Sequence, residues 1–361
     1  MPELLSVDLL SAQVGVACVV ELHSGVDAFY SSGYGVPPPE FLVDLESRQA
    51  AAGEAKMAQP VTIGGVEFMV QAHGWRQYTF LLVHPYGRIG ITTSEQFPTY
   101  RVQPLSVALL GLGAAGAVDW FENAVRSFDP TAEFHVSRLD LCCDVQGWSP
   151  TPEVERLMVC RSRHSAHYFD ENVLTGLTFG KRTTGGVMLR IYDKKREAHE
   201  QGLDYIGPLW GDRFDPTEPV WRVEFELGRK ALLQYGMDRT SDVFDRIGGV
   251  WAAVTDSLYR LAEESSDPNK SRWPTDPVWE LIQRASLRAD APPIERMLEY
   301  KRIGTLRTLQ APLTGMLSSV GALIDATSID EVLGQAAGMV QDHEVVSGRT
   351  FGDRVEEKRR R

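Results

Sequence analysis

Three segments of the chain alternate between apolar and polar residues, and this pattern constrains the fold more than any other feature. They read SRLDLCCD at residues 137–144, MLRIYDK at residues 188–194 and WRVEFEL at residues 221–227. Side chains alternate across a β-strand, so residues at positions i, i+2 and i+4 share one face. Each segment therefore predicts a strand with one apolar face and one polar face.

If the three strands share a sheet, their apolar faces pack on helices and their polar faces meet. The polar residues are four carboxylates, four cations and one tyrosine: Asp140, Asp144, Glu224, Glu226, Arg138, Arg190, Lys194, Arg222 and Tyr192. A half-exposed antiparallel sheet often carries Arg–Glu and Lys–Asp pairs across its wet face, each contributing less than about 1 kcal/mol. The polar face can therefore be interpreted as purely structural, and a catalytic interpretation is the alternative.

The rest of the chain predicts an α+β fold. Short β-branched and aromatic runs between residues 61 and 110 predict further strands, including one that ends in VALL at residues 107–110. Residues 117–128 predict a helix, and the pattern beyond residue 229 is mostly helical. We expect an antiparallel sheet backed by helices and a helical C-terminal region, divided as an N-terminal segment (1–60), a core (61–235) and a C-terminal region (236–361).

The composition of the chain indicates in which cellular compartment the protein resides. No apolar run reaches the roughly 18 residues of a membrane span, and the first residues do not have the pattern of a signal peptide. The four cysteines are Cys18, Cys142, Cys143 and Cys160. No two of them form a Cys-x-x-Cys pair, which argues against a thiolate metal site and a disulfide framework. We expect a cytoplasmic protein without a membrane partner.

Charge is distributed unevenly along the chain. The net charge is -12, yet residues 156–196 hold nine Lys/Arg against three Asp/Glu, whereas residues 1–137 hold six against fourteen. A basic stretch inside an acidic protein can bind nucleic acid locally, while the acidic remainder limits non-specific binding. The candidate DNA-binding residues in this stretch are Lys181, Arg182, Lys195 and Arg196.

The chemical interpretation of the polar face begins with its carboxylates. Oxygen ligands suit hard divalent cations such as Mg²⁺ or Mn²⁺. The candidate metal ligands are Asp140, Asp144, Glu224 and Glu226. Two or three of them would hold the ion, with water and a phosphate oxygen completing its coordination.

The tyrosine on the same face is a candidate nucleophile. A phenol has a pKa of about 10, so Tyr192 needs activation near neutral pH. Arg190 and Lys194 on the same predicted face would favour the phenolate and hold the phosphate. With a metal to polarise the phosphate, these groups would make a phosphodiester transesterase that leaves a 5′-phosphotyrosine and a free 3′-hydroxyl.

Four blocks in order along the chain resemble the replication initiation factor family. They are SRLDLCCD at residues 137–144, TGLTFG at 175–180, RIYDK at 190–194 with Glu197, and WRVE at 221–224. The family contains initiators of rolling-circle plasmids, some filamentous-phage replication proteins and relaxases of integrative conjugative elements. The resemblance spans about residues 61–233.

The resemblance implies a function as well as a fold. It implies site-specific nicking and joining of one DNA strand at a replication or transfer origin, to initiate rolling-circle replication of a plasmid or phage. It makes Tyr192 the nucleophile and Asp140, Asp144 and Glu224 the metal ligands, with Glu226 as a further candidate. It also implies a curved antiparallel sheet and a homodimer. Because no Walker loop is present, unwinding would need a host helicase.

Other functions fit parts of the sequence. A relaxase of an integrative conjugative element would use the same chemistry, and a non-catalytic DNA-binding regulator of replication would need only the basic stretch. Gly111, Gly113 and Gly116 match G-x-G-x-x-G after the predicted VALL strand, with Asp140 further on, as in an NAD-dependent enzyme. The downstream hairpin pattern argues against that class. Tyr168 and Tyr205 are weaker candidates for the nucleophile than Tyr192.

Overall fold

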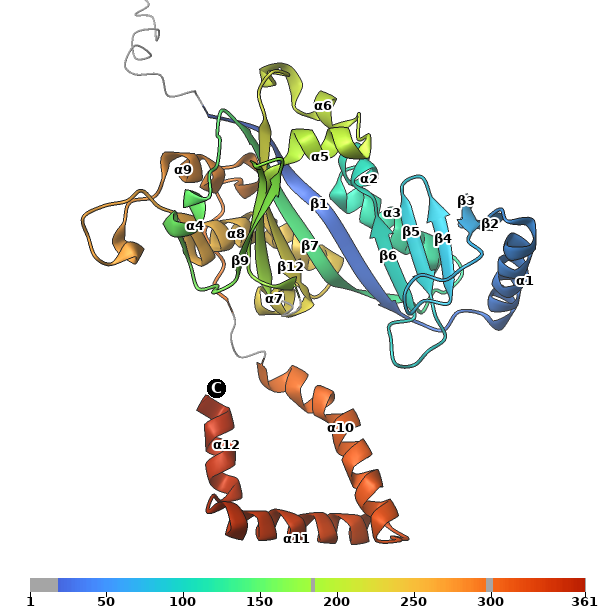
Figure 1. Cartoon of the computed structure of the whole chain (residues 1–361). Coiled ribbons are helices and arrows are strands. Elements are labelled where there is room, and N and C mark those ends of the chain that lie inside the picture. Colours follow the sequence, from blue (N-terminus) through green and yellow to red (C-terminus); the bar gives the residue numbers. More distant parts are fainter. Residues whose placement is uncertain (1–18, 183–185, 297–300, 361) are drawn as a thin grey trace, which may run out of the picture. The chain divides into compact units, whose positions relative to one another are not determined.

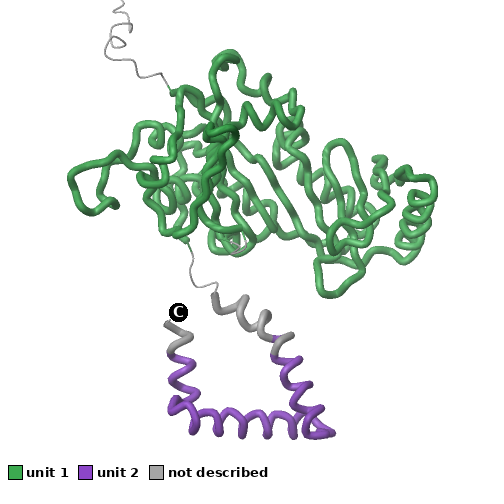
Figure 2. Tube along the Cα trace, viewed as in Figure 1, with its two compact units in different colours: residues 1–297 green, residues 298–361 purple. Residues whose placement is uncertain are grey.

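The computed structural model of the chain describes residues 19–182, 186–296 and 301–360. It divides into two compact units, Met1–Met297 and Leu298–Arg361 (Figure 2). The predicted divisions at residues 60/61 and 235/236 both lie inside the first unit. Cys18 lies outside the described residues.

An antiparallel sheet of 11 strands organises the first unit (Figure 1). Its strand order is β2-β3-β4-β5-β6-β1-β7-β12-β11-β10-β9. The strands are β1 (Val20–Tyr34), β2 (Gln59–Ile63), β3 (Val66–Val70), β4 (Phe80–His84), β5 (Gly87–Ile91), β6 (Tyr100–Pro104), β7 (Glu133–Gln146), β9 (Ser165–Asp170), β10 (Val173–Phe179), β11 (Val187–Asp193) and β12 (Val220–Gly228). A separate pair joins β8 (Met158–Cys160) and β13 (Tyr259–Leu261).

Helices pack on both faces of this sheet. Those of the first unit are α1 (Pro39–Ala55), α2 (Ser106–Gly111), α3 (Ala114–Arg126), α4 (Glu153–Leu157), α5 (Lys194–Gln201), α6 (Ile206–Leu209), α7 (Arg229–Gln234), α8 (Thr240–Ala252) and α9 (Pro277–Gln283). One core joins β7, β11 and β12 to α8 and α9, and a second joins β2–β6 to α3. A third core joins β1 and the start of β12 to α5 and α6, on the opposite face. The second unit consists of α10 (Lys301–Leu323), α11 (Ile329–Ser347) and α12 (Phe351–Arg360).

The predicted α+β fold with an antiparallel sheet and a helical C-terminal region is confirmed. The three alternating segments lie in β7, β11 and β12, which are neighbours in the sheet. Their apolar residues are buried together in one core: Leu139, Leu141, Cys143, Leu189, Ile191, Val223, Phe225 and Leu227. Burial of one apolar face fixes the register, because a slip by one residue would turn every side chain to the opposite face.

The strand predicted to end in VALL is wrong, and the alternative of a dinucleotide-binding turn depended on it. Strand β6 ends at Pro104, which has no N–H to continue the ladder, and the VALL segment lies in α2. Gly111 ends α2, and Gly113, with φ of 73°, precedes α3. Gly111 and Gly113 therefore lie at a turn between two helices, Gly116 lies inside α3, and a helix stands where an NAD-binding turn requires a strand.

The longest strand of the sheet, β1, has no clear pattern in the sequence. It pairs with β6 and β7, and its register shifts three times, between Glu21 and His23, Val26 and Ala28, and Tyr30 and Ser31. Each bulge reverses the alternation of side chains. A period of two therefore never persists long enough to be recognised.

Candidate functional site

The polar faces of β7, β11 and β12 form one continuous surface. Tyr192 lies opposite Arg222, which in turn lies opposite Asp144. Arg190 lies opposite Glu224 in the same ladder. Strand register alone thus brings together residues that are separated by about 30 to 80 positions in the sequence.

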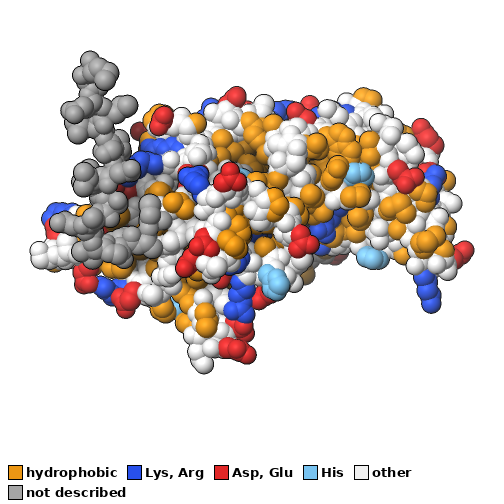
Figure 3. Space-filling view, turned by 90° about the horizontal axis from the view of Figure 1, so that it is seen from above, with side chains coloured by type: hydrophobic (Ala, Val, Ile, Leu, Met, Phe, Trp, Pro, Cys, Tyr) orange, Lys and Arg blue, Asp and Glu red, His pale blue; other side chains and the backbone are white. Residues whose placement is uncertain are grey.

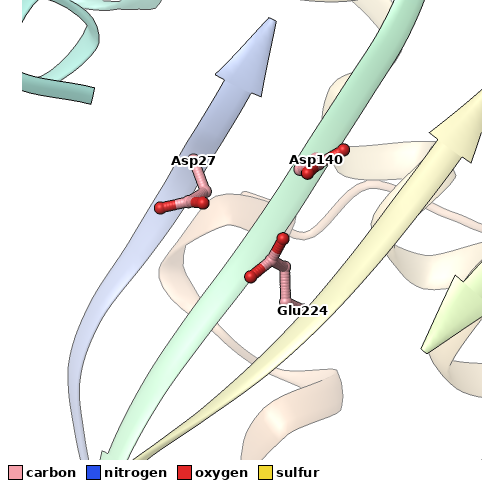
Figure 4. Close-up of side chains that lie close together, drawn as sticks. All are labelled: Asp27, Asp140 and Glu224. Carbon is pink, nitrogen blue, oxygen red and sulfur yellow. The ribbon is translucent and has the colours of Figure 1, made fainter. Parts of the chain in front are cut away.

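Three carboxylates on adjacent strands form an acidic cluster. Asp27 of β1, Asp140 of β7 and Glu224 of β12 each offer one oxygen atom, and these atoms lie within 4.8 Å of one another (Figure 4). Asp140 and Glu224 are fully buried, whereas the Asp27 side chain is 23% exposed. Solvent therefore reaches the cluster on the side of Asp27.

Asp27 is the member that the sequence did not reveal. It lies at the register shift between Val26 and Ala28 in β1. The bulge places its side chain on the polar face of the sheet beside Asp140 and Glu224. The only sequence signal is a single acid inside an otherwise apolar stretch, VDAF, which many surface strands also contain.

Glu224 is the centre of the cluster's contacts. The hydroxyl of Tyr192 donates a hydrogen bond to Glu224 Oε2 at 2.7 Å, and Arg190 contacts Glu224 Oε1. Arg190 also donates to Asp140 Oδ2 at 3.1 Å. Burial raises the pKa of Glu224 to about 8, with further upward contributions from Asp27 and Asp140 that Arg190 opposes. Burial likewise raises the pKa of Asp140.

The surroundings of Tyr192 stabilise the neutral phenol in the absence of a metal. Burial raises its pKa well above the ordinary value, the charge of Glu224 raises it further, and Arg222 opposes both. The predicted lowering of this pKa by Arg190 and Lys194 is therefore not seen. Strand β11 ends at Asp193, so Lys194 begins α5 instead of continuing the strand. Its Nζ still lies 5.8 Å from the centroid of the Tyr192 ring.

Asp144 and Glu226 lie on the same face but outside the acidic cluster. Arg222 holds Asp144 through two hydrogen bonds of 2.6 and 2.7 Å, and Trp210 Nε1 donates a third at 2.8 Å. Burial would raise the pKa of Asp144, but Arg222 and Trp210 hold it below the usual value. Glu226 pairs with Arg138 at 2.9 Å and with Arg182 at 2.8 Å. Both carboxylates are thus occupied by cations of the protein.

The four predicted DNA-binding cations differ in their surroundings. Lys181 and Arg182 line an open pocket of about 610 Å³ beside Tyr192. In contrast, Lys195 donates to the carbonyl oxygen of Glu218 at 3.0 Å. Arg196 pairs with Glu200 at 2.8 Å and with Asp170.

The pocket beside Tyr192 depends on a glycine. Gly176 of β10 lies opposite Tyr192 on one side and Tyr168 on the other. A Cβ atom on Gly176 would lie 3.3 Å from Cβ of Tyr192, which is tighter than most real contacts. The missing side chain leaves room next to the phenol for a group of a substrate.

One face of the protein mixes both signs of charge. Figure 3 shows acidic and basic side chains scattered among apolar ones on this face, without a large patch of one sign. On this face, local groups of a few cations would matter more than a global field for a charged partner. Among the described helices, none combines the length and apolar character that crossing a membrane requires.

Comparison with known proteins gives limited matches. No family model matches the chain. The chain is 26% identical over 222 residues to "Uncharacterized protein ORF430" of Pseudomonas phage Pf1, a match that covers 52% of this chain and 49% of that protein. The chain thus spans about half the length of the curated relative it matches.

Among solved structures, one match is described as a rolling circle replication initiator protein from Geobacillus stearothermophilus. It is 14% identical with a TM-score of 0.43, and it covers 76% of this chain and 99% of that one.

Proposed function

We propose that this protein cuts and rejoins one strand of DNA, with Tyr192 as the nucleophile, to initiate rolling-circle replication of a plasmid or phage. The observation that carries this proposal is the 2.7 Å hydrogen bond from the Tyr192 hydroxyl to Glu224, a member of the acidic cluster. A phenol beside clustered carboxylates and an open pocket suits attack on a phosphodiester. The four sequence blocks that resemble the replication initiation factor family contain both residues.

The residues present fit a hard divalent cation such as Mg²⁺ or Mn²⁺. Asp27, Asp140 and Glu224 would hold it, since their oxygen atoms already lie within 4.8 Å of one another. Each of the three also pairs with an arginine: Asp27 with Arg222, Asp140 with Arg138 and Arg190, and Glu224 with Arg190. Burial raises the pKa values of Asp140 and Glu224, and the charges of Asp27 and Asp140 raise that of Glu224 further. Asp144 and Glu226 lie outside the cluster and are the weaker candidates.

A residue of the chain takes the proton of the nucleophile, and solvent protonates the leaving group. Tyr192 Oη attacks the phosphorus atom, and its proton passes to the Glu224 carboxylate that already accepts its hydrogen bond. The bond from phosphorus to the 3′-oxygen breaks, and that oxygen takes a proton from solvent. The products are a 5′-phosphotyrosine and a free 3′-hydroxyl. When bound, the cation would withdraw charge from the phosphate oxygens and favour the ionised phenol. The reverse attack by a 3′-hydroxyl rejoins the strand.

Partners follow from this proposal. The DNA would carry a replication origin, a host helicase would unwind it, and a second copy of the chain would complete a homodimer. A relaxase of a conjugative element would use the same residues on a transfer origin. These partners stay predictions.

The decisive experiment compares wild type with Tyr192→Phe. Purified protein is mixed with Mn²⁺ or Mg²⁺ and supercoiled DNA that carries the gene's own neighbourhood, then denatured and examined for covalent protein–DNA adducts. We expect nicked circles and adducts with wild type, and a loss of about 10³-fold or more with Tyr192→Phe, because the nucleophilic oxygen is gone.

Tyr205→Phe is the matched control. Its hydroxyl contacts Ser106 Oγ at 2.6 Å, away from the acidic cluster, so its activity should equal that of wild type. Tyr168→Phe tests the other tyrosine that faces the pocket. Adducts that persist in Tyr192→Phe, or that vanish only in Tyr168→Phe, would disprove the assignment of the nucleophile.

A further inference from the structure

The polar face of the sheet continues beyond the acidic cluster into the first half of the molecule. Arg101 and Gln103 of β6 alternate with the buried Val102, so both lie on the polar face. Arg88 of β5 lies opposite Gln103, and Gly90 lies opposite Arg101. None of these residues belongs to the blocks that suggested a function.

Cations and aromatic rings follow one another along this face. The Arg138 guanidinium lies 5.1 Å from the centroid of the Tyr30 ring, and that of Arg101 lies 4.9 Å from the same ring. Arg101 also lies 5.0 Å from the Trp75 ring, and Arg88 lies 5.2 Å from it. We call Arg88, Trp75, Arg101, Tyr30 and Arg138 the arginine strip. These cation–π distances are short enough to orient each guanidinium.

The strip is attached to the acidic cluster at one end. Arg138 Nε donates to Asp140 Oδ1 at 2.8 Å. Gln103 Nε2 donates to the Tyr30 hydroxyl at 3.1 Å and fixes the next ring along. A continuous series of contacts thus leads from Asp140 outward to Arg88 on β5.

A glycine lets the outer rings lie against the sheet. A Cβ atom on Gly90 would lie 2.8 Å from the Tyr78 ring and 3.1 Å from the Trp75 ring. Any side chain at this position would push both rings away from the backbone. The outer end of the strip therefore depends on Gly90.

Two arginines of the strip have no carboxylate partner. Among the residues that the structure describes, Arg88 and Arg101 form no ion pair, whereas Arg138 pairs with Asp140 and Glu226. The buried Nε of Arg101 has no hydrogen-bond partner. Burial lowers the pKa of Arg101, and the nearby charges of Arg76 and Arg138 lower it further. Uncompensated cations gathered in a protein of net charge -12 indicate an anionic ligand.

We propose that the arginine strip binds the phosphate backbone of a single DNA strand that runs to or from the acidic cluster. This inference rests on the proposed function. A guanidinium can stack its face on a ring while its edge donates to phosphate oxygens. Half-buried aromatic rings beside a line of cations suit a single strand, whose unpaired bases stack on aromatic side chains.

The test measures binding separately from cleavage. A fluorescein-labelled single-stranded oligonucleotide from the origin region is titrated, in EDTA, with the full chain carrying Tyr192→Phe, over a range of salt concentrations. Adding Arg88→Gln and Arg101→Gln should weaken binding about tenfold and reduce the slope of log affinity against log salt by about 1.4, or about 0.7 for each lost phosphate contact.

Two further variants separate this proposal from trivial effects. Arg284→Gln removes the same charge from α9, where Arg284 pairs with Glu280 at 2.9 Å, and should bind like its parent. Arg88→Lys with Arg101→Lys keeps both charges and should restore most of the salt slope. If the glutamine variant bound weakly because it misfolded, restoring the charges would not be expected to restore the slope.

Three outcomes would disprove this role of the arginine strip. The glutamine variant could bind with the same affinity and salt slope as the Arg284→Gln control, or the lysine variant could fail to restore the slope. In a parallel titration with duplex DNA, the glutamine variant could lose affinity for the duplex and not for the single strand. None of them bears on whether wild type nicks DNA, which the Tyr192→Phe comparison decides separately.

Discussion

At the scale of single residues, Glu224 has conflicting surroundings. It is fully buried on a polar sheet face, accepts the Tyr192 hydrogen bond and lies within 4.8 Å of two other carboxylates. Arg190 pairs with it, and the charges of Arg190 and Arg222 oppose the rise of its pKa without cancelling it. Such a residue is poorly stabilised as an anion until another cation arrives.

This environment predicts a pH-dependent stability. The pKa of Glu224 is about 8 in the folded protein and 4.5 ordinarily, so folding favours the protonated form. Its contribution to stability is therefore present below its unfolded pKa and is lost as the pH rises through about 8. Without metal, we expect the melting temperature to fall from about pH 5 to about pH 8, and to fall less in Glu224→Gln. Thermal unfolding in EDTA measures both.

Mn²⁺ supplies the control for this prediction. Added near the upper end of the pH range, it should raise the melting temperature of wild type more than that of Glu224→Gln, because the ion binds the ionised carboxylate. Identical pH curves for the two proteins would show that Glu224 does not titrate as proposed.

At the scale of secondary-structure elements, β1 completes the site that β7 and β12 begin. Its bulge between Val26 and Ala28 places Asp27 beside Asp140 and Glu224. Asp27 also accepts a hydrogen bond from Arg222, the residue that holds Asp144. Strand β1 thus supplies the third carboxylate of the acidic cluster and links the cluster to the buried ion pair of Arg222 and Asp144.

Asp27→Asn should weaken metal binding by about tenfold or more, because it removes one charged ligand while preserving size and hydrogen bonding. Mn²⁺ titration followed by electron paramagnetic resonance measures the affinity. Asp44→Asn on α1 is the control, since the Asp44 side chain is 42% exposed and, among the described residues, its ion pair is with Arg48 on its own helix. Equal affinity in Asp27→Asn and Asp44→Asn would exclude Asp27 from the metal site.

At the scale of the whole molecule, the proposed chemistry belongs to one unit. The acidic cluster, Tyr192, the pocket and the three hydrophobic cores all lie within Met1–Met297. In the second unit, α10 and α11 pack on each other, and many of their apolar residues are exposed. Each unit can therefore be considered by itself.

A chain that ends at residue 297 should keep the main unfolding transition and the nicking chemistry. We expect its melting temperature to lie within a few degrees of the full chain, because no hydrophobic core is cut. Calorimetry and the adduct assay measure the two properties. A truncated chain that aggregates or loses the main transition would show that residues 298–361 are part of the folding unit.

The sequence by itself determined the strands whose alternation is regular. Residues 137–144, 188–194 and 221–227 predicted the shared polar face, and with it Tyr192, Asp140 and Glu224, because a period of two survives wherever one face is buried. The sequence also predicted the α+β class. It could not reveal Asp27, since three bulges hide the pattern of β1.

Only the tertiary structure decided which charges meet. Asp144 and Glu226 lie on the same strand face as the other carboxylates, but the fold pairs them with different partners. Asp144 contacts Arg222 and Trp210, and Glu226 contacts Arg138 and Arg182. The arginine strip joins residues from five separate segments, so no local sequence pattern predicts it. Side-chain period is a property of neighbours along the chain, whereas ion pairing depends on neighbours in space, which the fold alone provides.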